Sequence, residues 1–210
     1  MSTPPRVRTV LWDADGVLQR VPDGWEESMR PAMEGRVEDL EGFLAEAFWE
    51  ERPALTGEIP WSEILPGFLD RWGIADALDE VVQSWLTIEE VDGTHDVVRA
   101  LRRSGVRCAL ATNQDVRRAK VMHEQFRYDE LLDEAFYSCE LGAAKPEPAF
   151  FSTILDRLDS SPASVLFIDD NVGNVEAARQ VGLVAEAWSY AEPLDVLHDH
   201  LARHALWPVG

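Results

Sequence analysis

Residues 8–16 of the chain read RTVLWDADG. The apolar run that ends at Trp12 predicts a short buried strand, and the polar residues after it predict a loop. Asp13 and Asp15 lie two residues apart directly after that strand, and Gly16 lets the backbone turn sharply away. Two such carboxylates can divide phosphoryl transfer between them, one attacking phosphorus and the other moving protons. Because the same string also forms ordinary turns, its meaning depends on the rest of the chain.

From residue 92 onward the chain alternates between predicted helices and strands. We expect helices over residues 94–104, 115–126, 148–158, 172–181 and 193–204, and strands over 107–112, 135–138, 164–169 and 183–188. Repeated strand–helix units imply a parallel sheet with helices on both faces, an α/β fold of the Rossmann-like type. Ligand sites in such sheets form beyond the carboxyl ends of the strands, where Asp13, Thr112 and Asp169 all fall.

Residues 17–91 follow a different pattern, with apolar side chains at helical spacing in two segments. These side chains are Leu40, Phe43, Leu44, Ala47 and Phe48 in the first segment and Ile64, Leu65, Phe68, Leu69 and Trp72 in the second. Packing between helices explains them. We therefore expect a small α-helical unit, residues 17–91, inserted after the first strand of an α/β core formed by residues 1–16 and 92–210.

Three further polar clusters follow predicted strands. Thr112 and Asn113 offer a hydroxyl and free backbone amides to an anion, although a strand end followed by a helix cap explains them equally. Lys145, in a tight loop, can neutralise a phosphate, although a lone lysine is usually solvated. Asp169 and Asp170 follow an apolar strand, where adjacent carboxylates are costly unless a cation shares them. An ordinary surface turn is the alternative for this last pair.

The clusters follow one another as Asp-x-Asp, Thr, Lys and Asp-Asp. In this order the chain, from Val7 to Trp188, resembles the haloacid dehalogenase superfamily, whose signature consists of these four motifs. The strings Lys145-Pro146-Glu147 and Asp169-Asp170-Asn171 are most similar to its phosphatase-like subfamily, whose fourth motif begins with two aspartates and which includes bacterial sugar-phosphate phosphatases. In that family an insertion at residues 17–91 is a helical cap that closes over the site and excludes water.

The resemblance implies a role for each matching acid. Asp13 would be the nucleophile and a metal ligand. Asp15 would be the general acid and base, with its backbone carbonyl also meeting the metal. Asp170 would ligate Mg²⁺ directly and Asp169 would assist, either directly or through water. Hard oxygen ligands with retained waters are the coordination that Mg²⁺ prefers, so Mg²⁺ is the expected cofactor.

The remaining matched residues would hold the phosphoryl group. The resemblance implies that Thr112 and the backbone of Asn113 bind its oxygens and that Lys145 steadies it. Arg20, in the loop at the cap entrance, is a further candidate for contact with a substrate anion, with a solvated arginine as the alternative. One departure is Asn174, which stands where some relatives carry another acid after the fourth motif.

The expected activity is hydrolysis of a small phosphorylated metabolite, with a sugar phosphate as a candidate. A phosphomutase uses the same four motifs and differs in its cap, so it remains an alternative. Dehalogenases of the superfamily work without metal and lack the acids that stand here as Asp15 and Asp170, which argues against that chemistry. A phosphate-binding or scaffold protein without turnover is the alternative outside enzymes.

Charge and composition exclude other classes. The formal net charge is −20, whereas a nucleic-acid partner requires a basic face. Apolar runs stay well short of the roughly 18 residues that span a bilayer, and residues 1–8 lack the apolar core of a signal peptide. We therefore expect a cytoplasmic protein without nucleic-acid or membrane partners, as a monomer, with a homodimer as the alternative.

Overall fold

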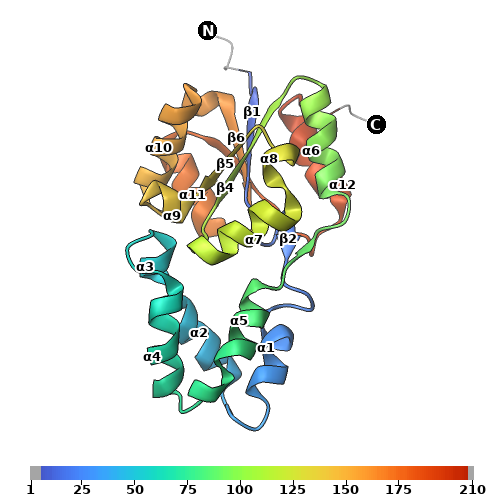
Figure 1. The fold of residues 1–210 in the computed structure, drawn as a ribbon. Coiled ribbons are helices and arrows are strands. Elements are labelled where there is room, and N and C mark those ends of the chain that lie inside the picture. Colours follow the sequence, from blue (N-terminus) through green and yellow to red (C-terminus); the bar gives the residue numbers. More distant parts are fainter. Residues whose placement is uncertain (1–5, 208–210) are drawn as a thin grey trace.

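The computed structural model describes residues 6–207. Five parallel strands form one sheet in the order β5-β4-β1-β6-β7 (Figure 1). The strands are β1 (Thr9–Trp12), β4 (Arg107–Thr112), β5 (Glu134–Tyr137), β6 (Val165–Asp169) and β7 (Val184–Ala187). β1 lies at the centre, and its Leu11 stands in register with Ala109 of β4 and Phe167 of β6. The fold is the predicted α/β type with a Rossmann-like parallel sheet.

Helices cover both faces of this sheet. One face packs against α6 (Thr94–Arg103), α7 (Val116–Phe126), α8 (Tyr128–Leu131) and α12 (Leu194–Arg203), and the other against α10 (Pro148–Leu158) and α11 (Val172–Val181). Val10 and Trp12 of β1 join the first of these cores and Leu11 joins the second. Because side chains alternate across a strand, one short apolar run fills both cores. Burial of each large apolar side chain contributes about 1.5–3 kcal/mol.

A separate helical unit, residues 25–86, lies on one side of the sheet beyond α7 (Figure 1). Its elements are α1 (Trp25–Met33), α2 (Leu40–Glu50), α3 (Arg52–Leu55), α4 (Trp61–Arg71), the 3-10 turn η1 (Ala75–Ala77) and α5 (Leu78–Leu86). The unit has its own hydrophobic core, in which Phe43, Phe68 and Trp85 are buried. Across residues 6–207, every helix is too short or too polar to traverse a lipid bilayer.

Two short strands connect this helical unit to the sheet. β2 (Gln19–Arg20) and β3 (Glu89–Glu90) pair antiparallel, and Leu18 and Val91 beside them pack into the core under the sheet. The sequence predicts a loop over residues 17–25, and that prediction is wrong at β2. A two-residue strand is too short to show the alternation by which strands are recognised.

Candidate active site

Asp13, Lys145 and Asp169 meet at the carboxyl ends of β1 and β6. Lys145 Nζ lies 2.6 Å from Asp13 Oδ1 and 2.7 Å from Asp169 Oδ2, and all three side chains are buried. Burial, followed by the charge of Asp169, raises the pKa of Asp13 well above its usual value, and Lys145 opposes that shift. Burial alone would lower the pKa of Lys145, but the carboxylates of Asp13 and Asp169 outweigh it and the pKa is raised. The lysine is therefore a fixed cation beside Asp13.

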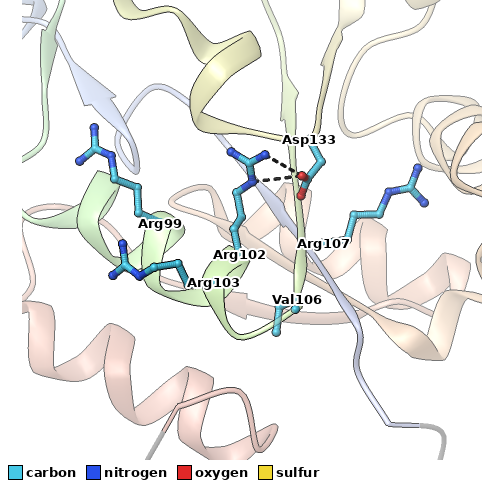
Figure 2. Close-up of a pocket in the computed structure, with 7 residues that line it drawn as sticks. Arg99, Arg102, Arg103, Val106, Arg107 and Asp133 are labelled. Atoms are coloured by element: carbon cyan, nitrogen blue, oxygen red, sulfur yellow. Dashed lines mark hydrogen bonds and ion pairs between the residues drawn. The ribbon is translucent and has the colours of Figure 1, made fainter.

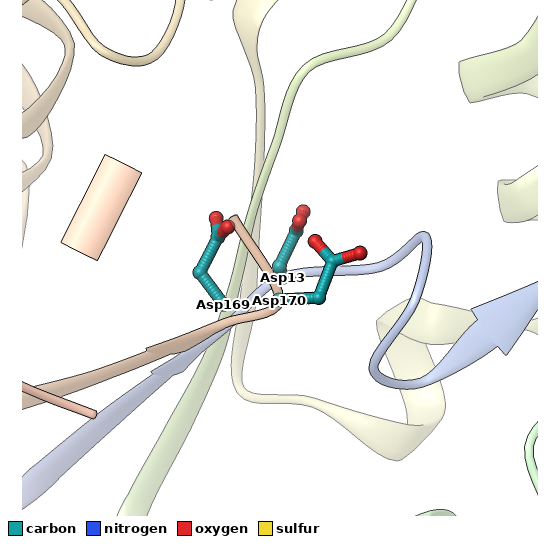
Figure 3. Close-up of side chains that lie close together, drawn as sticks. All are labelled: Asp13, Asp169 and Asp170. Carbon is teal, nitrogen blue, oxygen red and sulfur yellow. The ribbon is translucent and has the colours of Figure 1, made fainter. Parts of the chain in front are cut away.

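Carboxylate oxygens of Asp13, Asp169 and Asp170 lie within 4.8 Å of one another, and we call these residues the carboxylate cluster (Figure 3). Burial, and then the charge of Asp169, raises the pKa of Asp170 to about 6. Three carboxylates against one lysine leave negative charge that a cation would relieve. Their hard oxygen atoms suit Mg²⁺, so the residues present fit this metal.

Neighbouring residues fix the cluster in place. Asp169 accepts hydrogen bonds from the Asn171 backbone at 2.8 Å and from Asn174 Nδ2 at 3.1 and 3.2 Å, besides its contact with Lys145. A Cβ atom added at Gly16 would lie 2.2 Å from Asp170 Oδ2. Only glycine therefore lets the loop after β1 approach Asp170 this closely. Asn174 contacts Asp169 directly and is connected to Lys145 through that carboxylate.

Asp15 has a different set of partners. Its carboxylate accepts hydrogen bonds from Gln19 Nε2 at 3.0 Å and from Gln114 Nε2 at 2.6 Å, and it pairs with Arg118 Nη2 at 2.6 Å. Burial would raise the pKa of Asp15, but the charge of Arg118 and the hydrogen bonds outweigh it, and the pKa is lowered. Asp15 is thus held as a carboxylate, turned toward α7 and outside the carboxylate cluster.

Thr112 and Asn113 lie at the carboxyl end of β4. Thr112 is buried, and its Oγ1 accepts a hydrogen bond from Gln114 Nε2 at 3.3 Å. The side chain of Asn113 donates to the Lys145 carbonyl at 2.9 Å and accepts from the Lys145 backbone amide at 2.8 Å. Asn113 therefore fastens the loop that carries Lys145 to the end of β4. The predicted contact of its backbone with a phosphoryl group stays a prediction.

Arg20 lies apart from these residues. It belongs to β2, its Nη2 pairs with Glu89 at 2.6 Å, and its guanidinium lies 5.4 Å from the ring centre of Tyr190. These partners hold the side chain at the connection between the sheet and the helical unit. The predicted contact of Arg20 with a substrate anion stays a prediction.

Three residues that contact Asp15 were not predicted from the sequence as part of a site, and they are Gln19, Gln114 and Arg118. Arg118 is only 2% exposed although it is charged. Besides pairing with Asp15, it donates to the backbone carbonyl of Trp85 and lies 4.9 Å from the ring centre of Trp25. Arg118 thus joins Asp15 to two residues of the helical unit. A lone arginine in a predicted helix carries no sequence signal for such a role, whereas Gln114 directly follows the predicted Thr112–Asn113 cluster.

A cavity of about 690 Å³ lies away from this site, at the amino end of the sheet where β4 begins. Figure 2 shows that its arginines point in different directions, and Arg102 turns to Asp133 at 2.8 Å. Arg107 pairs with Glu134 and Arg99 with Asp96. Because Arg99, Arg102 and Arg107 are paired with carboxylates and the arginine side chains do not converge, the cavity lacks the geometry of an anion site.

The fold, the three clusters at the strand ends and the loop of Lys145 together are typical of one class of hydrolase. A family model described as haloacid dehalogenase-like hydrolase matches residues 7–182. That match includes β1 and its aspartates, the ends of β4 and β6, and the loop of Lys145. The chain belongs to the haloacid dehalogenase-like hydrolase family, as the resemblance of its motifs predicts.

Relatives within that family include enzymes named for phosphate release. The N-acetylmuramic acid 6-phosphate phosphatase of Pseudomonas aeruginosa is 27% identical over 202 residues, which cover 90% of this chain and 86% of that protein. The sesquiterpene phosphatase astK of Aspergillus oryzae is 34% identical over 91 residues, 42% of this chain and 45% of that protein, so the match spans less than half of its length. Among solved structures, a haloacid dehalogenase family enzyme of Bacteroides thetaiotaomicron in complex with magnesium and inorganic phosphate matches with a TM-score of 0.74. It is 20% identical, and the match covers 91% of this chain and 98% of that one.

Proposed function

We propose that this protein is a Mg²⁺-dependent phosphatase that hydrolyses a small phosphorylated metabolite through an aspartyl-phosphate on Asp13. The observation that carries the proposal is the contact between Asp13 and the buried Lys145 at 2.6 Å, beside the further carboxylates of Asp169 and Asp170. A lysine and a nucleophilic carboxylate together can receive a dianionic phosphoryl group that the net charge of −20 would otherwise repel.

In the first step an oxygen of Asp13 forms a bond to phosphorus, and the bond from phosphorus to the ester oxygen breaks. The leaving oxygen takes a proton from Asp15. In the second step water attacks the same phosphorus, Asp15 takes the proton of that water, and inorganic phosphate leaves Asp13 regenerated. The proton that Asp15 gains in the second step is the one it gives in the next cycle. The lowered pKa of Asp15 suits its role as the base of the second step.

Asp13 and Asp170, with Asp169 and the backbone carbonyl of Asp15, would hold Mg²⁺, which when bound would offset charge on the phosphoryl oxygens. Lys145 neutralises the same region through its contacts with Asp13 and Asp169. Thr112 and the backbone of Asn113 would bind the remaining oxygens of the phosphoryl group. The magnesium and phosphate complex of the Bacteroides thetaiotaomicron enzyme, which shares this fold, supports the choice of metal.

The helical unit would act as the cap. It is joined to the sheet by β2 and β3, and Arg118 connects it to Asp15 through Trp85. Closure over the strand ends would exclude bulk water, so that the aspartyl-phosphate is attacked only by a water that Asp15 activates. A phosphorylated sugar is a reasonable substrate class, because the Pseudomonas aeruginosa relative is named for one.

The test is release of phosphate from para-nitrophenyl phosphate, with and without Mg²⁺, in ¹⁸O-labelled water. Labelled inorganic phosphate should appear in amounts that match the alcohol released. Formation of an isomeric sugar phosphate from glucose 1-phosphate with little free phosphate would instead identify a mutase. Absence of turnover on every phosphate ester tested would favour a protein that binds phosphate without hydrolysing it.

A further inference from the structure

A cavity of about 770 Å³ lies where the helical unit faces the catalytic loop. Figure 1 shows α3 opposite α9 (Ser138–Leu141), and the two helices are in contact. We call residues 49–58 the α2–α3 corner. The lining residues come from both sides, and they are Trp49, Arg52, Pro53, Leu55, Thr56 and Glu58 from this corner and Ala144, Lys145, Pro146 and Glu147 from the loop.

Lys145 connects this cavity to the chemistry. Its Nζ lies 2.6 Å from Asp13 Oδ1, so a phosphoryl group on Asp13 would sit at the side of the lysine. Lys145 belongs both to the cavity lining and to the candidate site, so the rest of the substrate would extend past the loop of Lys145 toward the α2–α3 corner. This placement rests on the proposed function, because it assumes that Asp13 is the nucleophile.

Trp49 offers an apolar surface to the cavity. Its side chain is 67% exposed, whereas Trp61 and Trp85 of the same helical unit are buried in its core. An exposed indole face costs hydration free energy unless a ligand covers it. The C–H face of a sugar ring or another flat ring is the chemistry that stacks on such a surface.

Arg52 offers a positive charge beside that indole. Its guanidinium lies 4.5 Å from the ring centre of Trp49. Arg30, Arg36 and Arg71 of the helical unit each pair with a carboxylate, but within residues 6–207 no carboxylate lies in salt-bridge range of Arg52. A planar guanidinium binds the paired oxygens of a carboxylate or a phosphate.

We propose that Trp49 and Arg52 form the subsite for the leaving group, and that the substrate is a phosphate monoester of a cyclic alcohol with a second anionic group. Trp49 stacks on the ring and Arg52 binds the second anion. Glu58 and Glu147, which line the same cavity, accept hydrogen bonds from ring hydroxyls. A carboxylate and a second phosphate present the same paired oxygens to Arg52, and the choice between them is made by experiment.

The experiment compares five probes on the full chain with Mg²⁺. Glucuronic acid 1-phosphate and glucose 1,6-bisphosphate carry a ring and a second anion, glucose 1-phosphate carries only the ring, 3-phosphoglycerate carries only the anion, and glycerol 3-phosphate carries neither. The preference in kcat/KM for the better of the first two probes over glucose 1-phosphate should fall roughly 10- to 100-fold in Arg52→Gln. In Trp49→Ala the preference for ring probes over open-chain probes should fall roughly 2- to 10-fold, and Trp49→Phe should restore it.

The matched control is Arg71→Gln, since Arg71 is an exposed arginine of the same unit that pairs with Glu50 and lies outside the cavity lining. This control should keep both preferences. The proposed subsite is wrong if Arg52→Gln keeps the preference for a second anion, or if the wild-type protein shows no such preference while hydrolysing acetyl phosphate. Failure of the wild-type protein to hydrolyse even acetyl phosphate would instead overturn the proposed function on which the subsite rests.

Discussion

The carboxyl ends of the strands and the helical unit hold their charged groups in opposite ways. At the strand ends, Asp13, Lys145 and Asp169 are buried and in mutual contact. In the helical unit the charges lie mainly on the surface over a core of aromatic side chains, and Arg52 stands at a cavity without an acid partner. A substitution among buried, mutually paired charges leaves a partner unpaired, whereas an exposed residue has fewer contacts to lose. The difference suggests that the sheet fixes the chemistry and the helical unit selects the substrate.

Removal of the metal should have the largest effect on hydrolysis. The carboxylate cluster holds three acids against one lysine, so without a cation its negative charge opposes the substrate phosphate. EDTA should reduce hydrolysis of para-nitrophenyl phosphate to the uncatalysed rate, and added Mg²⁺ should restore it. Full activity in chelator would show that the cluster has another purpose.

Asp15→Asn should have the next largest effect. The variant keeps the shape of the side chain but cannot move a proton, so kcat should fall roughly 10²- to 10⁴-fold with little change in KM. Steady-state kinetics with para-nitrophenyl phosphate measure both quantities. A rise in KM by a comparable factor, with kcat unchanged, would show that Asp15 acts in substrate binding instead.

Substitution of Arg118, which connects the two regions, should have a smaller effect on turnover. In Arg118→Gln the pKa of Asp15 should rise, because the largest influence that lowers it is the charge of Arg118. The second step needs ionised Asp15 to take the proton of the water, so where that step limits kcat the acidic limb of the pH profile of kcat should move to higher pH. We expect kcat at neutral pH to fall roughly tenfold. Arg118→Lys keeps the charge and should shift the limb less, whereas an unmoved limb in both variants would separate Arg118 from the chemistry.

A substitution at Glu51, a buried residue of the helical unit, should affect turnover least. It is buried and accepts a hydrogen bond from Trp85 Nε1 at 3.1 Å, and burial, followed by the charge of Asp115, raises its pKa to about 8. The folded-state pKa exceeds the unfolded value, so the protonated form stabilises the fold and that contribution is lost as pH rises from about 4.5 to about 8.

Glu51→Gln should therefore unfold less readily than the wild-type protein at pH 8, by a few kcal/mol as an order of magnitude. Denaturant titrations at pH 5 and pH 8 give the free energies of unfolding. The gap between variant and wild type should widen with pH, and a gap that is constant between the two pH values would contradict the burial of an ionisable Glu51.

Much of the sheet could be predicted from the sequence. The strand Arg107–Thr112 and the helices Pro148–Leu158 and Val172–Val181 begin and end at the predicted residues. These segments have strong apolar runs or clear periodicity, with turn residues at their ends. The connection β2–β3 was missed because two-residue strands are held by tertiary context rather than by local pattern.

The residues of the candidate site also differ in whether the sequence could predict them. Asp13, Asp169 and Asp170 could be proposed because they stand in motifs at the ends of predicted strands, and parallel strands bring such ends to one edge. Lys145 could be proposed because its loop motif occupies the third place in the order of the family's four motifs. The partners of Asp15 could not, because Arg118 lies 103 residues away in sequence and no pattern marks a buried arginine. Arg20 was proposed from its place in the loop at the cap entrance, and the structure adds its pairing with Glu89 while its contact with a substrate anion stays a prediction.

The central claim is that Asp13 carries the phosphoryl group, and rapid acid quench tests it most directly. The protein is mixed with Mg²⁺ and ³²P-labelled acetyl phosphate, quenched within milliseconds, and digested to find the labelled peptide. Wild-type protein should carry acid-stable label on the peptide of Asp13, and Asp13→Asn should carry none and lose turnover by roughly 10⁴-fold or more. Label on another residue, or wild-type turnover in Asp13→Asn, would contradict the mechanism.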